Sequence, residues 1–466
     1  MLFNSQAFIL LFLPATLLLF LFLWGRERPT WALITLIGAS LSFYGWWNPV
    51  YIPLLVGSVL FNFTIAHLMV HRNRNSWQRA ALLMLGVSFN LFLLGYFKYA
   101  DFFLHSFGSL TGAAFTLTAT TLPLAISFYT FQQISYLVDV WRNRGGEYDL
   151  LHYAAYVTFF PQLIAGPIVR HDELIPQLGL DPLRYGFWER LGRGTVLFCI
   201  GLAKKVFIAD EMARIVDPAF ADAAANGAIA FSDAWLGAGA FACQIYFDFS
   251  GYSDMALGLA YMFGFRLPAN FNAPYRAASL REFWHRWHMT LSLFLRDYLY
   301  VAFGGNRKGE VRRYLNLIVT MLLGGLWHGA GWTFVVWGFA HGMGLAVNSA
   351  FDRTRFILPR GVGWLLTLVF WIETMILFRA ETFDTAWVFF SAMHGWNFSL
   401  SPLDAGELGL VFIAAMVAII GPTSQDFAFS RLVSTRRAAI VAGIVLASTT
   451  VVVGGEAERE FIYFQF

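Results

Sequence analysis

Long apolar runs separated by short polar segments set the pattern of this chain. A helix that crosses a bilayer needs about 20 apolar residues, with about 17–25 tolerated. The runs that approach this length predict roughly 11 or 12 transmembrane helices in an all-α, polytopic membrane protein. They are Ala7–Trp24, Thr30–Trp46, Tyr51–Val70, Ala80–Tyr96, Thr121–Val140, Thr195–Ala213, Ala228–Phe247, Leu315–Trp327, Trp332–Ala350, Val362–Phe378, Leu408–Ile420 and Ala438–Val453.

Basic residues fall in alternate loops between these runs. Short cytoplasmic loops are enriched in Lys and Arg. If both termini lie on the outer side, the predicted helices place the basic loops in the cytoplasm and the loops without Lys or Arg outside. The positive loops are Arg26–Arg28, Arg72–Arg79, Arg142–Arg144, Arg276–Arg286, Arg307–Arg313, Arg353–Arg360 and Arg431–Arg437. The loops without Lys or Arg are Asp101–Thr120, Val216–Asp233 and Ala380–Glu407.

Two regions do not fit simple spans. Phe241–Tyr300 is aromatic but is interrupted by acidic and basic residues and a proline. Tyr153–Ile168 is broken by Pro161, Gly166 and Pro167. Polar or irregular backbone at membrane depth is tolerated where it is buried in protein or lines a water-filled cavity. We therefore expect re-entrant or interfacial helices around a central cavity, in a single domain over residues 1–466.

Composition supports the membrane assignment. Hydrophobic residues make up 58% of the chain and charged residues 13%, against about 25% charged in an average soluble domain. The formal net charge of +3 gives no basis for a nucleic-acid partner. Cys199 and Cys243 lie in apolar stretches and are expected to be buried and unpaired. Ala7–Trp24 is longer than the apolar core of a signal peptide, so we expect a retained helix.

His328 is the strongest candidate for chemistry. It lies in Gly324-Gly-Leu-Trp-His-Gly-Ala-Gly-Trp332, within an apolar hairpin. An ionisable residue inside the membrane is a functional-site hypothesis by default, and the small residues around it let another backbone or a substrate approach. A neutral imidazole accepts a proton near neutral pH. The alternative is a histidine that only joins two helices by a hydrogen bond.

Other reaction centres have weaker support. His285 and His288 are three residues apart, which leaves a metal site open, but neither His288 nor His328 has a suitable partner on its own helix face. No G-x-S-x-G elbow or glycine-rich phosphate loop is present. His67, His71, His105, His152, His171 and His394 are expected to be plain polar residues at the surface or an interface. His341 follows in Trp337-Gly-Phe-Ala-His-Gly342.

Seven segments, in order along the chain, match the pattern of a known family. They are Met1–Phe8 with Phe12-Leu-Pro14, Pro123–Phe131, Phe160–Ile168, Tyr246–Asp254, Phe283–Tyr300, Leu326–Ala330 and Phe461–Phe466. Together they resemble the membrane-bound O-acyltransferases. The bacterial branch of alginate O-acetyltransferase and D-alanyl-lipoteichoic-acid acyltransferase proteins is the most similar, with its alginate type closer than its D-alanyl type.

The resemblance assigns roles to two histidines. The essential histidine of the family falls on His328, and a second polar position falls on His288. It implies an acyl donor substrate, acetyl-CoA by analogy, with no bound cofactor or metal. Arg276–Arg286 and Arg307–Arg313 are then expected to attract the donor's phosphates. His328 acts as general base or as transient acyl carrier, while His288 orients or polarises the thioester.

The function implied by the resemblance is O-acetylation of an exported, alginate-like polysaccharide from the bacterial inner membrane. A periplasmic acetyltransferase is the expected partner that completes transfer. Transfer of D-alanine, or acetylation of peptidoglycan or cellulose, is the alternative on the same scaffold. A transporter is disfavoured because no pair of similar halves with matching broken helices is visible. A purely structural membrane protein is disfavoured by the polar residues concentrated in Phe241–His328.

Overall fold

The computed structural model describes residues 1–70, 76–112, 121–396, 398–429, 436–455 and 459–464. Regular structure in these residues consists of helices, with no strand among them, as the sequence predicted. His71, part of the loop Arg72–Arg79, most of Arg431–Arg437 and the last residues of Asp101–Thr120 lie outside the described residues. The chain divides into two compact units, and the single domain predicted from the sequence stays a prediction.

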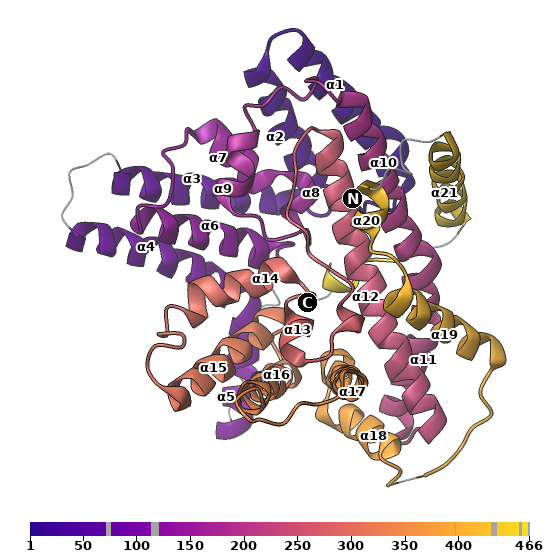
Figure 1. The fold of residues 1–466 in the computed structure, drawn as a ribbon. Coiled ribbons are helices and arrows are strands. Elements are labelled where there is room, and N and C mark those ends of the chain that lie inside the picture. The colour runs from indigo at the N-terminus through magenta and orange to yellow at the C-terminus, as the bar shows by residue number, and fades with distance from the viewer. Residues whose placement is uncertain (71–75, 113–120, 397, 430–435, 456–458, 465–466) are drawn as a thin grey trace. The chain divides into compact units, whose positions relative to one another are not determined.

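The first unit contains Met1–Cys199, Ser253–Pro268 and Ala428–Glu460. In it, α1 packs on α2, α2 on α7, and α6 on both α3 and α4 (Figure 1). Its elements, with η for π- and 3₁₀-helical segments, are η1 Phe8–Phe12, α1 Leu13–Gly25, α2 Pro29–Gly45, η2 Pro49–Tyr51, α3 Ile52–Val70, α4 Ser76–Leu94, η3 Gly95–Tyr99, α5 Ala100–Thr111, α6 Ile126–Trp141, α7 Leu150–Thr158, α8 Phe160–Leu163, α9 His171–Leu174, η4 Ile175–Gln177, much of α10 Phe187–Lys204, the end of α12 and α21 Arg436–Gly455.

The second unit contains Ile200–Tyr252, Ala269–Phe427 and Phe461–Phe466. Here α15 packs on α16, α16 on α17, and α18 on both α11 and α17. The elements are η5 Lys205–Ala209, α11 Asp210–Asn226, α12 Phe231–Met262, η6 Pro274–Arg276, α13 Leu280–Trp284, α14 Met289–Phe294, η7 Leu295–Tyr300, α15 Glu310–His328, α16 Trp332–Phe351, α17 Arg360–Arg379, α18 Phe383–Met393, α19 Ala405–Ile420, α20 Ser424–Phe429 and η9 Ile462–Phe464.

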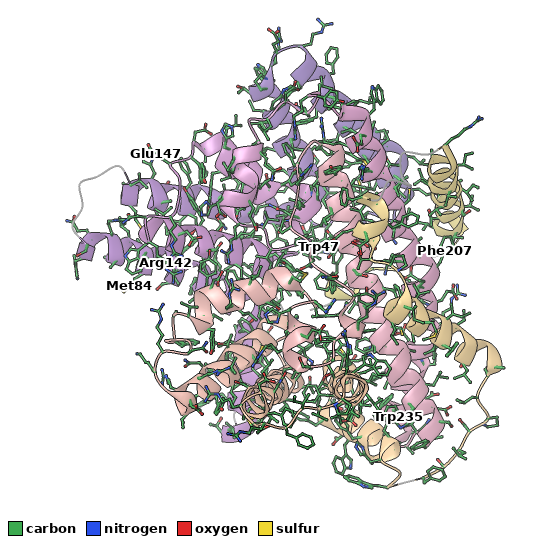
Figure 2. The ribbon with its side chains drawn as sticks, in the orientation of Figure 1. Trp47, Met84, Arg142, Glu147, Phe207 and Trp235 are labelled. Carbon is green, nitrogen blue, oxygen red and sulfur yellow. The ribbon has the colours of Figure 1, made fainter. Side chains whose placement is uncertain are left out.

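Several helices are long and apolar enough to cross a membrane. By length and composition five qualify among the described residues: Phe8–Gly25, Pro49–Val70, Ser76–Thr111, Trp332–Phe351 and Arg360–Arg379. Ala405–Ile420 and Ala439–Val453 are shorter apolar helices. Large apolar side chains such as Met84 and Phe207 are exposed on the helices (Figure 2). A polytopic, all-helical membrane protein is therefore confirmed. The 11 or 12 predicted spans exceed the five long apolar helices of the described residues. Several predicted runs form shorter helices, such as α2 with 17 residues and α6 with 16.

The region Phe241–Tyr300 corrects one prediction. Its first part, expected to be broken, belongs to the continuous helix α12. The helix continues through Asp248, whose carboxylate has partners in the protein. Short helices occur later, as η6, α13, α14 and η7, and their re-entrant or interfacial position stays a prediction. Tyr153–Ile168 also breaks as predicted, at Phe159 between α7 and α8. Helix α18, in contrast, was missed, because the sequence assigned it to a loop.

A buried ion cluster in the second unit surrounds Asp248 of α12. Lys205 Nζ lies 2.7 Å from Asp248 Oδ1 and 3.0 Å from Asp210 Oδ1, and Lys205 and Asp248 are each 2% exposed. The other oxygen of Asp248 accepts the backbone N–H of Ile462 at 3.0 Å. The cluster thus joins η5, α11, α12 and η9.

Removing one charge from this cluster tests its role in stability. Lys205→Met leaves Asp248 as a buried charge without its cation, so we expect a loss of about 3–5 kcal/mol. The double variant Lys205→Met/Asp248→Asn should recover much of this loss. Thermal unfolding of the purified protein in detergent measures both. Arg214→Met, at an exposed ion pair on α11, is the matched control and should cost less than about 1 kcal/mol. Equal losses for Lys205→Met and Arg214→Met would contradict the assignment.

Candidate active site

His328 is the last residue of α15 and lies in an aromatic enclosure within the second unit. The imidazole is 4% exposed. Its ring centroid lies 5.0 Å from that of Trp327, 5.2 Å from Trp337 and 5.3 Å from Phe378. These aromatic side chains come from α15, α16 and α17. The ring is therefore buried in protein and does not face lipid, as its position in an apolar hairpin predicted.

Glycines allow the two helices of this hairpin to approach closely. A Cβ on Gly325 would lie 2.3 Å from the carbonyl oxygen of Phe334, and one on Gly338 would lie 2.4 Å from that of Met321. Gly338 and Gly342 form a GxxxG pattern on α16, which is typical of close helix contacts in membranes. Of the glycines near His328, Gly325 allows the α16 backbone to approach because it has no side chain. Gly329 admits the Phe334 ring, 2.2 Å from where its Cβ would be.

His288 lies between α13 and α14 and is fully buried. Its backbone has φ +42° and ψ +53°, the left-handed conformation that is uncommon for residues other than glycine. The imidazole packs against Phe249, with 4.7 Å between ring centroids, and against Trp327, at 6.2 Å. Because His328 also packs against Trp327, the structure brings the two predicted histidines together around one indole.

A cavity of about 430 Å³ opens in the same unit. Arginines contribute to its lining, together with apolar side chains and the buried groups Trp284 and Ser349. The lining residues are Arg281, Trp284, His285, Met289, Ser292, Leu293, Leu295, Arg296, Tyr300, Asn306, Arg313, Leu317, Thr320, Met321, Leu345 and Ser349. Trp284 Nε1 and Ser349 Oγ are buried and have no hydrogen-bond partner among the described residues. They are available to a bound molecule.

Neither predicted histidine lines this cavity. The separation is aromatic: Trp284 in the cavity wall packs on Trp337, with centroids 6.0 Å apart, and Trp337 packs on His328. Met289 in the wall directly follows His288. Trp284 also contacts His341, which is fully buried and bonded through Nε2 to Thr374 Oγ1 at 3.1 Å.

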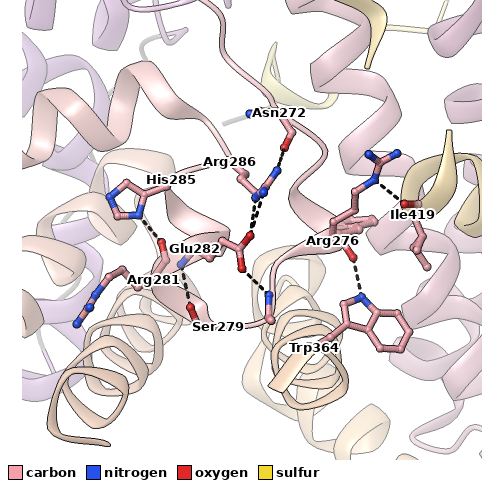
Figure 3. Close-up of polar contacts among 11 residues, drawn as sticks. Asn272, Arg276, Ser279, Arg281, Glu282, His285, Arg286, Trp364 and Ile419 are labelled. Atoms are coloured by element: carbon pink, nitrogen blue, oxygen red, sulfur yellow. Dashed lines mark hydrogen bonds and ion pairs between the residues drawn. The ribbon is translucent and has the colours of Figure 1, made fainter. Parts of the chain in front are cut away.

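The basic segment Arg276–Arg286 is largely committed to structural contacts (Figure 3). Arg276 donates to the carbonyls of Ile419 at 2.6 Å and Ile420 at 2.9 Å, at the end of α19. Arg286 donates to Glu282 Oε1 and to the carbonyl of Asn272, each at 3.0 Å. Arg281, which faces the cavity, is paired with Asp352 at 2.7 Å.

Glu282 organises the turn before α13. Partial burial raises the pKa of its carboxyl, but the N–H of Ala278 and the Arg286 guanidinium bond to it and hold the pKa below its ordinary value overall. Ser279 Oγ caps α13 by accepting the N–H of Glu282 at 3.1 Å. The turn is therefore fixed by local bonds, and Arg286 serves mainly to hold it.

The remaining histidines fall into two groups. His67, His105 and His394 are exposed and His152 is partly exposed, as expected for plain polar residues. His171 is not: it is 1% exposed, with Tyr148 Oη 3.1 Å from Nδ1 and Asp139 Oδ2 3.4 Å from Nε2.

The part of the chain that the structure describes contains no cluster of side chains suited to bind a metal ion. No group of three or more His, Cys, Asp or Glu residues there could hold an ion. His285 Nδ1 lies 2.7 Å from the carbonyl oxygen of Arg281, on its own short helix, and His288 Nδ1 lies 3.1 Å from Asn270 Oδ1. Cys199 and Cys243 are buried and unpaired, as predicted.

Comparison with known proteins identifies the family. Residues 142–382 match the model of the membrane-bound O-acyltransferase family. The peptidoglycan O-acetyltransferase of Helicobacter pylori is 42% identical over 427 residues, which is 85% of this chain and 80% of that protein. The probable alginate O-acetylase of Azotobacter vinelandii is 41% identical over 428 residues, 90% of this chain and 83% of that protein. The teichoic acid D-alanyltransferase of Streptococcus thermophilus is 28% identical over 241 residues, 50% of this chain and 58% of that protein.

An all-helical membrane protein with two buried histidines beside a cavity is thus placed in an enzyme class. The chain belongs to the membrane-bound O-acyltransferase family and is an acyltransferase. The identities also agree with the predicted branch, because the alginate O-acetylases match more closely and over more of the chain than the D-alanyltransferases do.

The α15–α16 contact generates a test of how His328 is placed. Gly338→Ala puts a methyl group 2.4 Å from the Met321 carbonyl oxygen, so the helices must separate. We expect destabilisation of about 1–3 kcal/mol and reduced acyl transfer. Gly409→Ala, within α19 and with open space around its Cβ, is the matched control and should be neutral or slightly stabilising. Thermal unfolding and transfer activity measure both variants. An unchanged Gly338→Ala protein would contradict the close contact.

Proposed function

We propose that this acyltransferase takes acetyl groups from a cytoplasmic donor, acetyl-CoA, and passes them across the bacterial inner membrane for O-acetylation of an exported, alginate-like polysaccharide. The relatives named as an O-acetyltransferase and an O-acetylase support the acetyl group. The basic loops predicted to be cytoplasmic contain Arg281 and Arg313 of the cavity, which supports entry of the donor from that side. A periplasmic acetyltransferase completes transfer to the polymer on the other side.

One observation carries the chemistry: two buried imidazoles pack on the same indole beside a cavity. His328 removes the proton of an acceptor hydroxyl as its oxygen attacks the thioester carbonyl. A C–O bond forms, the C–S bond breaks, and the proton passes to the leaving thiolate. Alternatively, His328 itself carries the acetyl group between donor and acceptor. His288 assists at the same centre.

The cavity is our candidate for the donor site. Arg313 supplies positive charge for phosphate groups. Arg281 and Arg296 also line the cavity, each paired with an aspartate, Asp352 and Asp297 respectively. The unpaired N–H of Trp284 and hydroxyl of Ser349 are placed to bond amide groups of a pantetheine arm. Since Trp284 and Trp337 separate the cavity from His328, transfer requires these indoles to shift when the donor binds.

Substitution of His328 tests the enzyme assignment. His328→Ala should abolish acetylation of the surface polysaccharide, and His288→Ala should reduce it strongly, while both proteins accumulate in the membrane. Loss of a general base typically costs about 10²–10⁴-fold in rate. Chemical analysis of polymer acetyl content in a deletion strain complemented with each variant provides the measurement. His394→Ala, an exposed histidine of the same unit, is the control. Full acetylation with His328→Ala would remove His328 from the mechanism.

The basic loop Arg307–Arg313 provides a matched pair for the donor site. Arg313 lines the cavity and its neighbour Arg312 does not. Arg313→Glu should raise the KM for acetyl-CoA about tenfold or more, since a charge-assisted hydrogen bond contributes about 1.5–3 kcal/mol. Arg312→Glu should leave KM nearly unchanged. The measurement is thiol release from acetyl-CoA by the protein in nanodiscs. Equal changes of KM in the two variants would mean that the phosphates bind elsewhere, or that KM responds only to the overall charge of the loop.

The relatives also support an acetylated peptidoglycan, because one of them is named for that polymer. Mass analysis of the polymers from the deletion strain separates the possibilities. Loss of acetyl groups from an exported polysaccharide supports the proposal. Loss of acetyl groups from peptidoglycan or cellulose would show that the acceptor is that polymer and not an exported polysaccharide. Loss of alanyl groups from teichoic acid would show that the transferred group is D-alanyl and not acetyl.

A further inference from the structure

Asn270 holds one side of the His288 imidazole. The two residues are 18 positions apart in sequence, and both are fully buried. His288 Nδ1 lies 3.1 Å from Asn270 Oδ1. The backbones are joined as well, because the N–H of Met289 donates to the Asn270 carbonyl at 2.9 Å. This bond fixes the chain just after the left-handed residue, so both the main chain and the ring of His288 are tied to Asn270.

Thr290 identifies the atom of Asn270 that faces the ring. The Thr290 hydroxyl donates to Asn270 Oδ1 at 2.9 Å, and the Thr290 backbone N–H points to the same oxygen at 3.4 Å. A backbone N–H only donates. The amide atom at this point is therefore the carbonyl oxygen and not the NH₂ group. Such an oxygen accepts hydrogen bonds, so His288 Nδ1 must carry the hydrogen of the bond between them.

This hydrogen determines what the other ring nitrogen can do. A neutral imidazole has one donor and one acceptor nitrogen, and the bond made by one sets the state of the other. With Nδ1 protonated, Nε2 holds the lone pair. Burial disfavours the charged imidazolium, in which both nitrogens donate. Nε2 of His288 is then an acceptor or base and cannot donate a hydrogen bond to a carbonyl oxygen.

The geometry points to Asn270, supported by Thr290, as a positioning residue that locks His288 in the Nδ1–H tautomer and so makes its Nε2 a proton acceptor in acyl transfer. This inference rests on the proposed function and changes one part of it. His288 does not polarise the thioester carbonyl, as the resemblance led us to expect. It accepts a hydrogen bond from, or a proton of, the attacking hydroxyl or the neighbouring catalytic group. In the other tautomer, Nε2 would hold the hydrogen and would have no lone pair to accept a proton.

Two substitutions of Asn270 separate this role from a structural one. Asn270→Asp keeps an oxygen acceptor at the same place, so it should retain the tautomer and most of the activity. Asn270→Leu has no acceptor and should lower kcat about 10²-fold or more, with the KM for acetyl-CoA little changed. Asn272→Leu, an exposed position in the same segment, should leave both constants unchanged. Thiol release from acetyl-CoA in nanodiscs gives these values, and thermal unfolding checks that each variant folds.

The tautomer itself is measured independently of activity. Solid-state NMR of the full protein in lipid, with ¹³C,¹⁵N-histidine, reports the protonated nitrogen, and the His288→Gln spectrum identifies the His288 signals. We expect Nδ1–H in the wild type and in Asn270→Asp. An Nε2–H signal in the wild type would overturn the inference whatever the enzyme does. Nδ1–H together with full activity of Asn270→Leu would overturn the positioning role. The proposed function fails separately, if His328→Ala remains active.

Discussion

The backbone contact between α15 and α16 is the interaction on which the site depends. Lipid tails are as apolar as the side chains, so burying apolar surface between helices gains little free energy in a membrane. Helices there associate through close packing and hydrogen bonds. Gly325 and Gly338 bring the two backbones together, and the residues next to this contact are those of the site. Trp337 precedes Gly338 and reaches the ring of His328, which ends α15. Any side chain at the contact would move both aromatic rings at once.

Sequence predicted the fold class and the two histidines, but not how the structure surrounds them. Apolar length finds helices such as α16 and α17, because a span must bury its own backbone bonds. The same rule ended the predicted span before Asp248, although α12 continues through it. Apolar length takes no account of Lys205, a partner that is distant in sequence. Asn270 was missed for a related reason: an asparagine in an irregular segment has no periodicity, and its bond to His288 is a tertiary contact. His328, in contrast, stands out in the sequence as an ionisable residue within an apolar hairpin, and the resemblance added His288.

Positive charge in the second unit has two uses that sequence alone treated as one. Arg276 and Arg286 bond to carbonyls and to Glu282, and they hold α19 and the turn before α13. Arg313 lines the cavity. Counting basic residues by loop therefore overstates the charge available to a ligand. Attraction of an anion to this face is a property of the few guanidinium groups at the cavity, while the others maintain the framework around it.

The two units are interleaved along the chain, and this has a consequence for biosynthesis. Each unit contains an early, a middle and a late segment. A ribosome that feeds helices into the membrane one after another cannot finish either unit before it reaches the last segments. Asp248 receives the N–H of Ile462 only after more than 200 further residues have been made. Until then, a partly synthesised chain in the bilayer holds Asp248 without the N–H of Ile462, and neither unit is complete.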